Sequence, residues 1–441
     1  MLYTKDINNK NVLGIIRRFC NYIDPRLTEH GSHVAYLVFC MLHKTGEYTN
    51  QELRNICFAA QLHDIGAYKT EEISRMLQFE TKDVWDHSFY GYLFIRYFSP
   101  LHAFAPAVLL HHTAWKYLKQ EETLSPRLKN LCQAIHIADR IDVSMSMEKH
   151  SLAETLKSLN NGTGTIFAPH MLDLANKLNF KESIEEEWRK DEEYFDFLSK
   201  LPLSSNEITE YFKMLVFIID FRSHYTVTHT IATTSISYEL GLLLSLSEER
   251  LNQVLCGSLL HDLGKIAVPV EILEYPGKLS SQAMSIMRTH VNLTEKILGG
   301  NIDETILKIA LRHHEKLNGT GYPNHLTGVD LTTEERLVAI ADIISALTGT
   351  RSYKGSFPKE KIVSIVSKMK DDGLLDPFIV NLALQNLDPI LEITTIRSKP
   401  LIEIYDKLRS DYTYISKLNR YHEKISFALS LERPKNMCLW P

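Results

Sequence analysis

The sequence predicts an all-α protein made of two helical bundles in tandem. Apolar residues recur at helical spacing along most of the 441-residue chain, and neither half shows the alternating pattern of half-buried strands. Histidines and aspartates recur in the same order in both halves, which indicates a duplicated domain. The length suffices for two ordinary domains, which we place at residues 1–200 and 201–441.

The composition is that of a globular protein, with 44% hydrophobic residues, 23% charged residues and a net charge of −5. This mild acidity argues against a DNA or RNA polymer as partner, because such partners require a basic surface. No apolar run approaches the roughly 20 residues of a membrane span, and the N-terminus lacks the features of a signal peptide. Six scattered cysteines without a CxxC pair predict reduced thiols. We therefore expect a cytoplasmic protein with no membrane partner, and leave a homodimer open.

In the first half, two predicted helices lead to a His-Asp pair. Residues 33–44 favour an amphipathic helix, because His33 and Leu37 share one face with further apolar residues. The segment Thr49-Asn50-Gln51-Glu52 is a capping-box signature, and its helix ends at His63-Asp64. The other candidate ligands of this half follow downstream: His87, His111, His112 and Asp139.

The second half repeats this order. Ser247 opens a helix that ends at His261-Asp262, and both Ser247 and Thr49 lie fourteen residues before their His-Asp pair. The first half reads His33, His63-Asp64, His87, His111-His112, Asp139, and the second reads His229, His261-Asp262, His290, His313-His314, Asp342. Successive gaps are 30, 24, 24 and 28 residues in one half, and 32, 29, 23 and 29 in the other. The match indicates that each copy holds its own ligand set.

A polar stretch separates the halves. Residues 160–164 predict a turn, and the acidic runs at 185–187 and 191–193 predict an exposed helix face. Residues 208–221 then form an apolar helix that leads into the second bundle. Packing within the chain and contact with a second copy are both open for that helix.

The second-half residues are of the types that bind two transition metals. Helices that each offer one or two ligands to a bundle interior build carboxylate–histidine dimetal sites, and imidazole is a common ligand. Asp262 has two oxygens that can bridge the metals, which would create a bridging hydroxide and clamp an in-line phosphoryl displacement. Lys265, Arg351 and Lys354 place positive charge where a phosphate would lie.

A glycine-broken loop follows the adjacent histidines, in the run His313-His314-Glu315 to Gly319-Thr320-Gly321-Tyr322-Pro323. Its glycines allow close backbone approach, which a loop that receives a phosphate requires.

Together these motifs resemble the HD-GYP phosphodiesterases over roughly residues 205–410. The segments that carry the resemblance are His261–Lys265, Pro276–Leu279, Met287–His290, His313–Pro323 and Ala341–Lys354. The resemblance implies an all-helical fold and two divalent transition metals, Fe or Mn. It also implies a 3′,3′-cyclic dinucleotide substrate that is opened to the linear 5′-phosphorylated dinucleotide.

By that similarity the metal ligands are His229, His261, Asp262, His290, His313, His314 and Asp342. The substrate would be held by Lys265, Gly321, Tyr322, Pro323, Arg351 and Lys354, with Asp262 and Lys265 as catalytic residues. A tandem HD plus HD-GYP chain without a receiver or sensor domain resembles members active on 3′,3′-cGAMP. That substrate is therefore favoured narrowly over cyclic di-GMP.

Three positions depart from the pattern of that family. Tyr225 stands where some members carry a glutamate that supports a third metal, so we expect two metals. Asn318 replaces an aspartate in the loop. Ser345 replaces the aspartate expected three residues after Asp342, which predicts the loss of a supporting hydrogen bond.

The first half keeps the order of ligands but not the residues around them. Thr113-Ala114-Trp115 follows His111-His112 with no Gly-x-Gly-Tyr-Pro loop, and Ala67 stands at the position of Lys265. We interpret this half as a degenerate HD domain with a scaffolding, dimerisation or regulatory role. Its candidate second metal site comprises His33, His63, Asp64, His87, His111, His112 and Asp139.

Two other functions remain open at this point. A metal-dependent nucleotidase would act on mononucleotides or on the linear dinucleotide. A non-enzymatic sensor would bind a cyclic dinucleotide and contact partners through the Tyr322 loop.

Overall fold

The computed structural model describes residues 9–22, 29–68, 85–222, 228–275, 277–349, 357–418 and 421–432. Within these ranges every regular element is a helix, and β contacts are limited to two isolated bridges. The all-α prediction is confirmed. No helix in the described ranges is long and apolar enough to cross a membrane.

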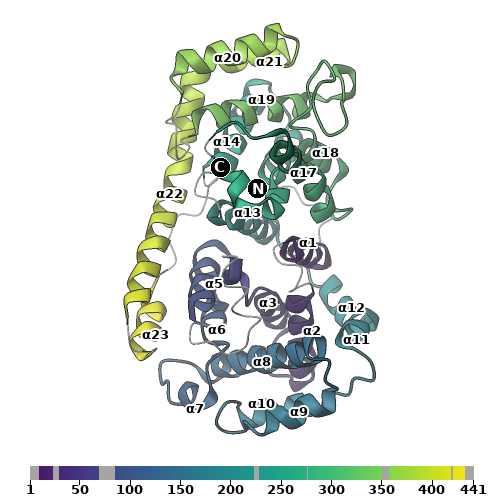
Figure 1. Ribbon diagram of the computed structural model, residues 1–441, viewed down its shortest axis with the longest axis vertical. Coiled ribbons are helices and arrows are strands. Elements are labelled where there is room, and N and C mark those ends of the chain that lie inside the picture. Colours follow the sequence, from purple (N-terminus) through teal and green to yellow (C-terminus); the bar gives the residue numbers. More distant parts are fainter. Residues whose placement is uncertain are drawn as a thin grey trace.

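The first bundle lies in the lower half of Figure 1. Its helices are α1 (Asn9–Asn21), α2 (His30–Leu42), α3 (Asn50–Gln61), α5 (Trp85–Phe98), α6 (Ala105–Leu110), α7 (Trp115–Leu118) and α8 (Pro126–Asp142). Four shorter helices follow: α9 (Leu152–Asn160), α10 (Pro169–Ala175), α11 (Ile184–Lys190) and α12 (Glu192–Lys200). The acidic residues of 185–187 and 191–193 lie on α11, on α12 and at the Asp191 cap between them, and they are exposed or half-buried, as predicted.

The second bundle occupies the upper half of Figure 1. Its helices are α13 (Ser205–Arg222), α14 (His229–Leu243), α15 (Glu248–Leu260), α16 (Val270–Leu273), α17 (Ser281–Leu298), α18 (Glu304–Leu311), α19 (Thr333–Thr348), α20 (Lys359–Asp371) and α21 (Pro377–Gln385). Two helices close the chain, α22 (Leu387–Lys417) and α23 (Tyr421–Ser430).

Local sequence sets the start of the helices that lead to the His-Asp pairs. Thr49 caps α3 in a full capping box, in which the Glu52 N–H donates to Thr49 Oγ1 and the Thr49 N–H donates to Glu52 Oε2. Ser247 caps α15 by accepting from the Arg250 N–H. The helix predicted at residues 33–44 begins earlier, at His30, which adds a histidine to its first turn.

The two bundles repeat the same packing unit around a glycine. A short 3₁₀ turn follows each His-Asp pair, at η3 (Ile65–Tyr68) and η6 (Leu263–Ala267), and packs against α5 or α17. A Cβ on Gly66 would lie 2.0 Å from the His87 carbonyl oxygen, and one on Gly264 would lie 1.9 Å from that of His290. Both turns therefore require glycine for the close approach of backbone to helix.

The two bundles share a hydrophobic core. One continuous cluster of buried side chains runs from Val12 in α1 to Leu431 and includes residues of both halves, whereas a second cluster belongs to the second bundle alone. Helix α13 lies between the bundles, and residues 208–219 of it are buried within the single chain. Helix α13 is therefore a packing helix, and its described residues offer no exposed apolar face to a second copy.

The long helix α22 connects the bundles a second time (Figure 1). Its first half packs on α14 and its second half on α5. The buried Tyr405 donates from its hydroxyl to the Phe217 carbonyl in α13 at 3.0 Å, and Tyr97 in α5 bonds Asp411. These contacts fix α22 to the shared core rather than leaving it as an extension.

Candidate functional site

The carboxylate of Asp262 lies at the centre of the second bundle between two groups of histidines. Its Oδ2 faces Nε2 of His261 at 3.1 Å and of His229 at 3.6 Å. Its Oδ1 faces Nε2 of His290 at 3.4 Å and of His313 at 4.0 Å. One carboxylate therefore presents one oxygen to each group, which is the arrangement that a ligand bridging two metals requires.

Asp342 and His314 complete the two groups. Asp342 Oδ1 lies 3.1 Å from His229 Nε2, and its Oδ2 lies 3.9 Å from His314 Nδ1. The structure thus brings together all seven residues expected to bind metal in this half. They come from α14, the end of α15, α17, the end of α18, and α19.

Backbone carbonyls orient three of these imidazoles. Nδ1 of His261 bonds the Ser258 carbonyl at 2.6 Å, and Nδ1 of His290 and His313 each bond the carbonyl three residues earlier, at 2.6 and 2.7 Å. A hydrogen bond at Nδ1 leaves Nε2 with its lone pair directed to the centre. Helical geometry therefore sets which nitrogen can bind a metal.

Burial keeps two of the histidines neutral. It lowers the pKa of His290 to about 4 and that of His313 to about 3, so both hold the neutral form that binds metals. Burial opposes charge on Asp262 as well, but His261 and Lys265 hold the pKa of that carboxyl well below its usual range. Asp262 is therefore ionised and available as an anionic ligand.

The residues fit a pair of divalent metals. His261 Nε2 and Asp262 Oδ1 are buried and have no hydrogen-bond partner within the described part of the chain. Buried polar atoms are almost always partnered, so these two atoms call for a cation between them. The imidazoles and ionised carboxylates form a donor set suited to Fe, Mn or Zn.

Ser345 keeps the supporting bond that the sequence analysis expected to be lost. Its Oγ lies 3.0 Å from His229 Nδ1 and also donates to the His229 carbonyl at 3.0 Å. The short serine side chain reaches His229 because α19 packs directly against α14. A neutral hydroxyl thus replaces an anionic partner while the geometry is preserved.

Glu315 shapes the loop that follows the adjacent histidines. Its buried carboxylate accepts from the Asn324 N–H at 2.7 Å and the Leu326 N–H at 3.0 Å. Gly321 passes so close to this residue that a Cβ there would lie 2.4 Å from Glu315 Cα. Asn318 accepts from the Thr320 N–H at 3.1 Å, so it performs the turn function that an aspartate would.

The loop places Tyr322 at the edge of the centre. Its ring stacks on His314 with centroids 4.6 Å apart, and the Arg288 guanidinium lies 4.7 Å from the ring centroid. Lys265 forms an ion pair with Asp262. Arg288 belongs to the Met287–His290 motif but was not predicted to bind substrate. Its position two residues before the ligand His290 was the sequence signal that could have identified it.

Three positions from the sequence analysis lie outside the described residues. These are Arg351 and Lys354, expected to bind substrate, and Tyr225, expected in place of a third-metal ligand. Pro323 follows Tyr322 in the loop and is half-buried.

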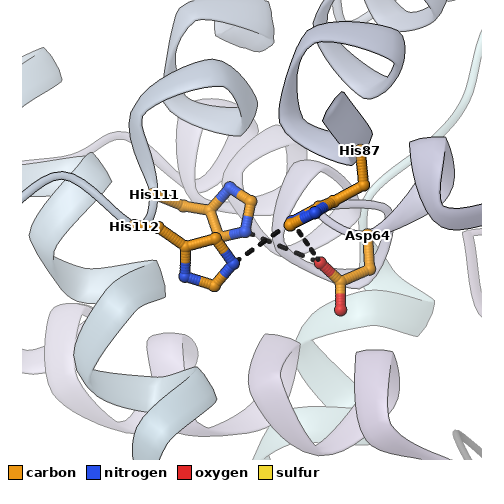
Figure 2. A group of neighbouring side chains, drawn as sticks. All are labelled: Asp64, His87, His111 and His112. Carbon is orange, nitrogen blue, oxygen red and sulfur yellow. Dashed lines mark hydrogen bonds and ion pairs between the residues drawn. The ribbon is translucent and has the colours of Figure 1, made fainter. Parts of the chain in front are cut away.

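The first bundle assembles a second group of the same kind, shown in part in Figure 2. The side chains of His87 and His111 face Asp64, whose Oδ1 lies 3.5 Å from His111 Nε2 and 3.7 Å from His87 Nε2. His112 lies beside them, with its Nε2 3.2 Å from His87 Nε2. His63 and Asp139 also join this group.

The prediction of His33 as a member of that group is corrected by the structure. His33 bonds Asp142 through Nδ1 at 2.8 Å, and His30 takes the central position, with its Nε2 3.4 Å from Asp139 Oδ1. Both histidines lie on α2, but His30 occupies its first residue, as His229 does in α14. The sequence spacing could have identified His30 as the counterpart of His229, because His30 precedes His63 by 33 residues and His229 precedes His261 by 32.

Comparison with known proteins agrees with the duplicated architecture. Two family models, both described as HD domain, match the chain. One matches residues 27–144 and the other matches residues 213–379. The chain belongs to the HD-domain family, with two such domains in tandem.

Its relatives include a 3′3′-cGAMP-specific phosphodiesterase 1 of Vibrio cholerae, 25% identical over 89% of this chain and 95% of the relative. A cyclic di-GMP phosphodiesterase response regulator of Xanthomonas campestris is 37% identical, over 32% of this chain and 38% of its own length. A solved structure of a cyclic GMP-AMP specific phosphodiesterase of V. cholerae has the same fold. It covers 87% of this chain and 98% of its own, with a TM-score of 0.56 and 19% identity.

Proposed function

We propose that the second domain hydrolyses a 3′,3′-cyclic dinucleotide to the linear 5′-phosphorylated dinucleotide, with 3′,3′-cGAMP preferred over cyclic di-GMP. The chain is a hydrolase of the HD phosphodiesterase class, in keeping with the activities named for its relatives. The preference for cGAMP rests on the relative that shares both domains, since the cyclic di-GMP enzyme from Xanthomonas matches a third of the chain.

The observation that carries the reaction is the central carboxylate of Asp262 with a histidine group on each oxygen. Two divalent metals held there would activate a water molecule and offset charge on the phosphoryl oxygens. Hydrolysis adds water across one phosphodiester: a bond forms to phosphorus, the bond to the 3′ oxygen breaks, and a 5′-phosphate remains. His229, His261 and Asp342 would hold one metal, and His290, His313 and His314 the other, with Asp262 shared.

The remaining residues have roles in binding and charge. Burial, together with Asp262 and Asp342, raises the pKa of Tyr322, so its hydroxyl stays protonated and can donate to a phosphoryl oxygen. Lys265 and Arg288 would offset negative charge at the rim. We keep Gly321 and Pro323 as parts of the substrate loop, and propose Arg351 and Lys354 as further phosphate ligands on sequence grounds.

Turnover of cyclic di-GMP and 3′,3′-cGAMP, measured side by side with Mn²⁺ or Fe²⁺, tests this proposal. We expect linear 5′-phosphorylated product from the wild type, faster with cGAMP, and none from the His261→Ala/Asp262→Ala double variant. His150→Ala, an exposed histidine in the first domain, is the matched control and should retain wild-type turnover.

Absence of cleavage of either ring, with metal shown to be bound, would contradict the phosphodiesterase proposal. Release of inorganic phosphate from mononucleotides would then identify a nucleotidase. Binding of a ring without any product would identify a sensor.

A further inference from the structure

We propose that the first domain holds a two-metal centre of its own, formed by His30, His63, Asp64, His87, His111, His112 and Asp139. This inference does not depend on the reaction of the second domain, because it concerns residues that the proposed reaction does not use.

The first argument is the pairwise match of ligand atoms around the bridging carboxylate. Asp64 Oδ1 faces His87 and His111, whereas its Oδ2 faces Nε2 of His63 at 3.4 Å and of His30 at 3.7 Å. Asp262 divides its two oxygens between histidines in the same way. The first domain therefore presents one carboxylate oxygen to each of two histidine groups.

The outer carboxylate matches as well. Asp139 Oδ1 faces His30 Nε2 at 3.4 Å, and its Oδ2 faces His112 Nδ1 at 3.8 Å. Asp342 makes the equivalent approaches to His229 and His314, again with Nδ1 of the second histidine of the pair. Seven ligand positions thus preserve the geometry although the loop after His112 has diverged.

The second argument is that buried polar atoms converge without partners. His63 Nε2, His111 Nε2 and Asp64 Oδ1 are buried and have no hydrogen-bond partner within the described residues. His63 and His111 each bond a backbone carbonyl through Nδ1, at 2.7 and 2.6 Å, so their Nε2 atoms are the ones directed to the centre. Figure 2 shows this orientation for His111. This is the pattern of oriented metal ligands.

The third argument concerns charge and support. Asp64 is a carboxylate in a buried site, and Ala67 stands where Lys265 supplies an ammonium to Asp262 in the other domain. Buried carboxylates are usually paired with cations or bound to metals. Asp142 bonds Nδ1 of His30 at 2.6 Å, which gives His30 an anionic support where His229 has the hydroxyl of Ser345. Imidazole and carboxylate ligands of this kind suit Mn, Fe or Zn.

The role of this centre is structural or regulatory. Thr113 occupies the position of Glu315, and Arg140 holds Asp139 Oδ2 through two N–H groups at 2.8 and 3.1 Å. Metals at this site would link α2, α3, α5, α8 and the end of α6. Their binding should therefore stabilise the first domain.

Metal content of the full-length chain tests the proposal. The protein is stripped with a chelator, reloaded with Mn²⁺, desalted and analysed by inductively coupled plasma mass spectrometry. We expect about four Mn²⁺ per wild-type chain, about two in Asp64→Asn and about two in Asp262→Asn, with the double variant close to zero. His150→Ala, the exposed histidine, should retain the wild-type content.

The Asp262→Asn chain decides the question even if Asp64→Asn fails to fold. Retention of about two Mn²⁺ by a chain with wild-type circular dichroism, together with a higher melting temperature on Mn²⁺ addition, supports the first-domain centre. A folded Asp262→Asn chain without Mn²⁺ overturns it. Failure of ring hydrolysis would leave this metal count unchanged, so the two proposals can fail separately.

Discussion

At the scale of single residues, the two domains support the same histidine position in different ways. His30 is bonded by the carboxylate of Asp142, and His229 by the hydroxyl of Ser345. An anionic partner raises the basicity of an imidazole ligand more than a hydroxyl does. The second-domain centre should therefore hold its metal less tightly than the first-domain centre at this position.

Substitution of Ser345 measures this support. Because hydrogen-bonded partners of ligands commonly change metal affinity by about 10- to 100-fold, we expect Ser345→Ala to weaken Mn²⁺ binding by that order. Ser345→Asp should strengthen it. The dissociation constant is measured by chelator competition in the Asp64→Asn background, with Ser285→Ala on the exposed face of α17 as control. Equal Mn²⁺ affinities in the Ser345→Ala, Ser345→Asp and Ser285→Ala chains would show that Ser345 does not support His229.

Glu315 is a second residue whose effect can be isolated. Glu315→Gln keeps the size of the side chain, but its amide N–H₂ would face one of the two backbone N–H groups that the carboxylate accepts. Loss of a hydrogen bond to a charged group costs about 1.5–3 kcal/mol, so kcat/KM should fall about 10- to 100-fold while metal content stays the same. Glu304→Gln, exposed on α18, is the control. A fall in metal content instead would mean that Glu315 supports the ligands rather than the loop.

At the scale of elements, the close contact of η6 with α17 determines where His290 lies relative to His261. A Cβ at Gly264 would meet the His290 carbonyl oxygen at 1.9 Å and the Thr294 nitrogen at 2.7 Å, and both are backbone atoms. The Thr294 hydroxyl also accepts from the Gly264 N–H at 2.8 Å. Backbone atoms cannot yield as the end of a flexible side chain can.

We therefore expect Gly264→Ala to lower the free energy of unfolding by at least about 2 kcal/mol, as overpacking of a tight contact does. The change should also separate the two histidine groups and reduce metal binding by the second domain. Urea denaturation followed by circular dichroism measures the stability. Gly14→Ala in α1, where the nearest atom to a new Cβ is 3.4 Å away, should leave stability unchanged or raise it slightly. Wild-type stability of Gly264→Ala would show that the turn adjusts freely.

At the scale of the whole molecule, the shared core and α22 connect the two domains. The cluster that includes Val12, Phe217 and Leu408 contains no gap between the bundles. Because apolar burial is continuous across both, unfolding of one domain would expose the core of the other. The domain boundary between residues 200 and 201 stays a prediction. The two domains on either side of it share one hydrophobic core.

The melting behaviour tests this connection. Differential scanning calorimetry should show one transition for the metal-loaded chain, and Tyr405→Phe should lower the melting temperature of that single transition. The buried hydroxyl of Tyr405 donates to Phe217 at 3.0 Å, and its removal costs about 1–2 kcal/mol. Tyr414 is 52% exposed on the same helix, so Tyr414→Phe should melt as the wild type does. Two separate transitions would show that the domains unfold independently.

Features that rest on local chemistry and spacing could be predicted from the order of residues alone. Helical periodicity predicted the all-α fold, the capping residues Thr49 and Ser247 predicted two helix starts, and repeated His-Asp spacing predicted the duplication. The seven candidate ligands of the second domain were named from their motifs, and the structure brings them together. Each of these features depends on residue type and order, which a sequence states directly.

Tertiary packing decided the rest. The choice of His30 over His33 depends on where α2 begins and on the position of Asp142, 109 residues from His33, so it follows from how α2 meets α8. The bond from Ser345 to His229 likewise depends on the distance between two helices. The role of α13 was undecided in the sequence because an apolar helix can face its own core or a second copy. Only the position of both bundles around α13 shows that its described residues are buried within one chain.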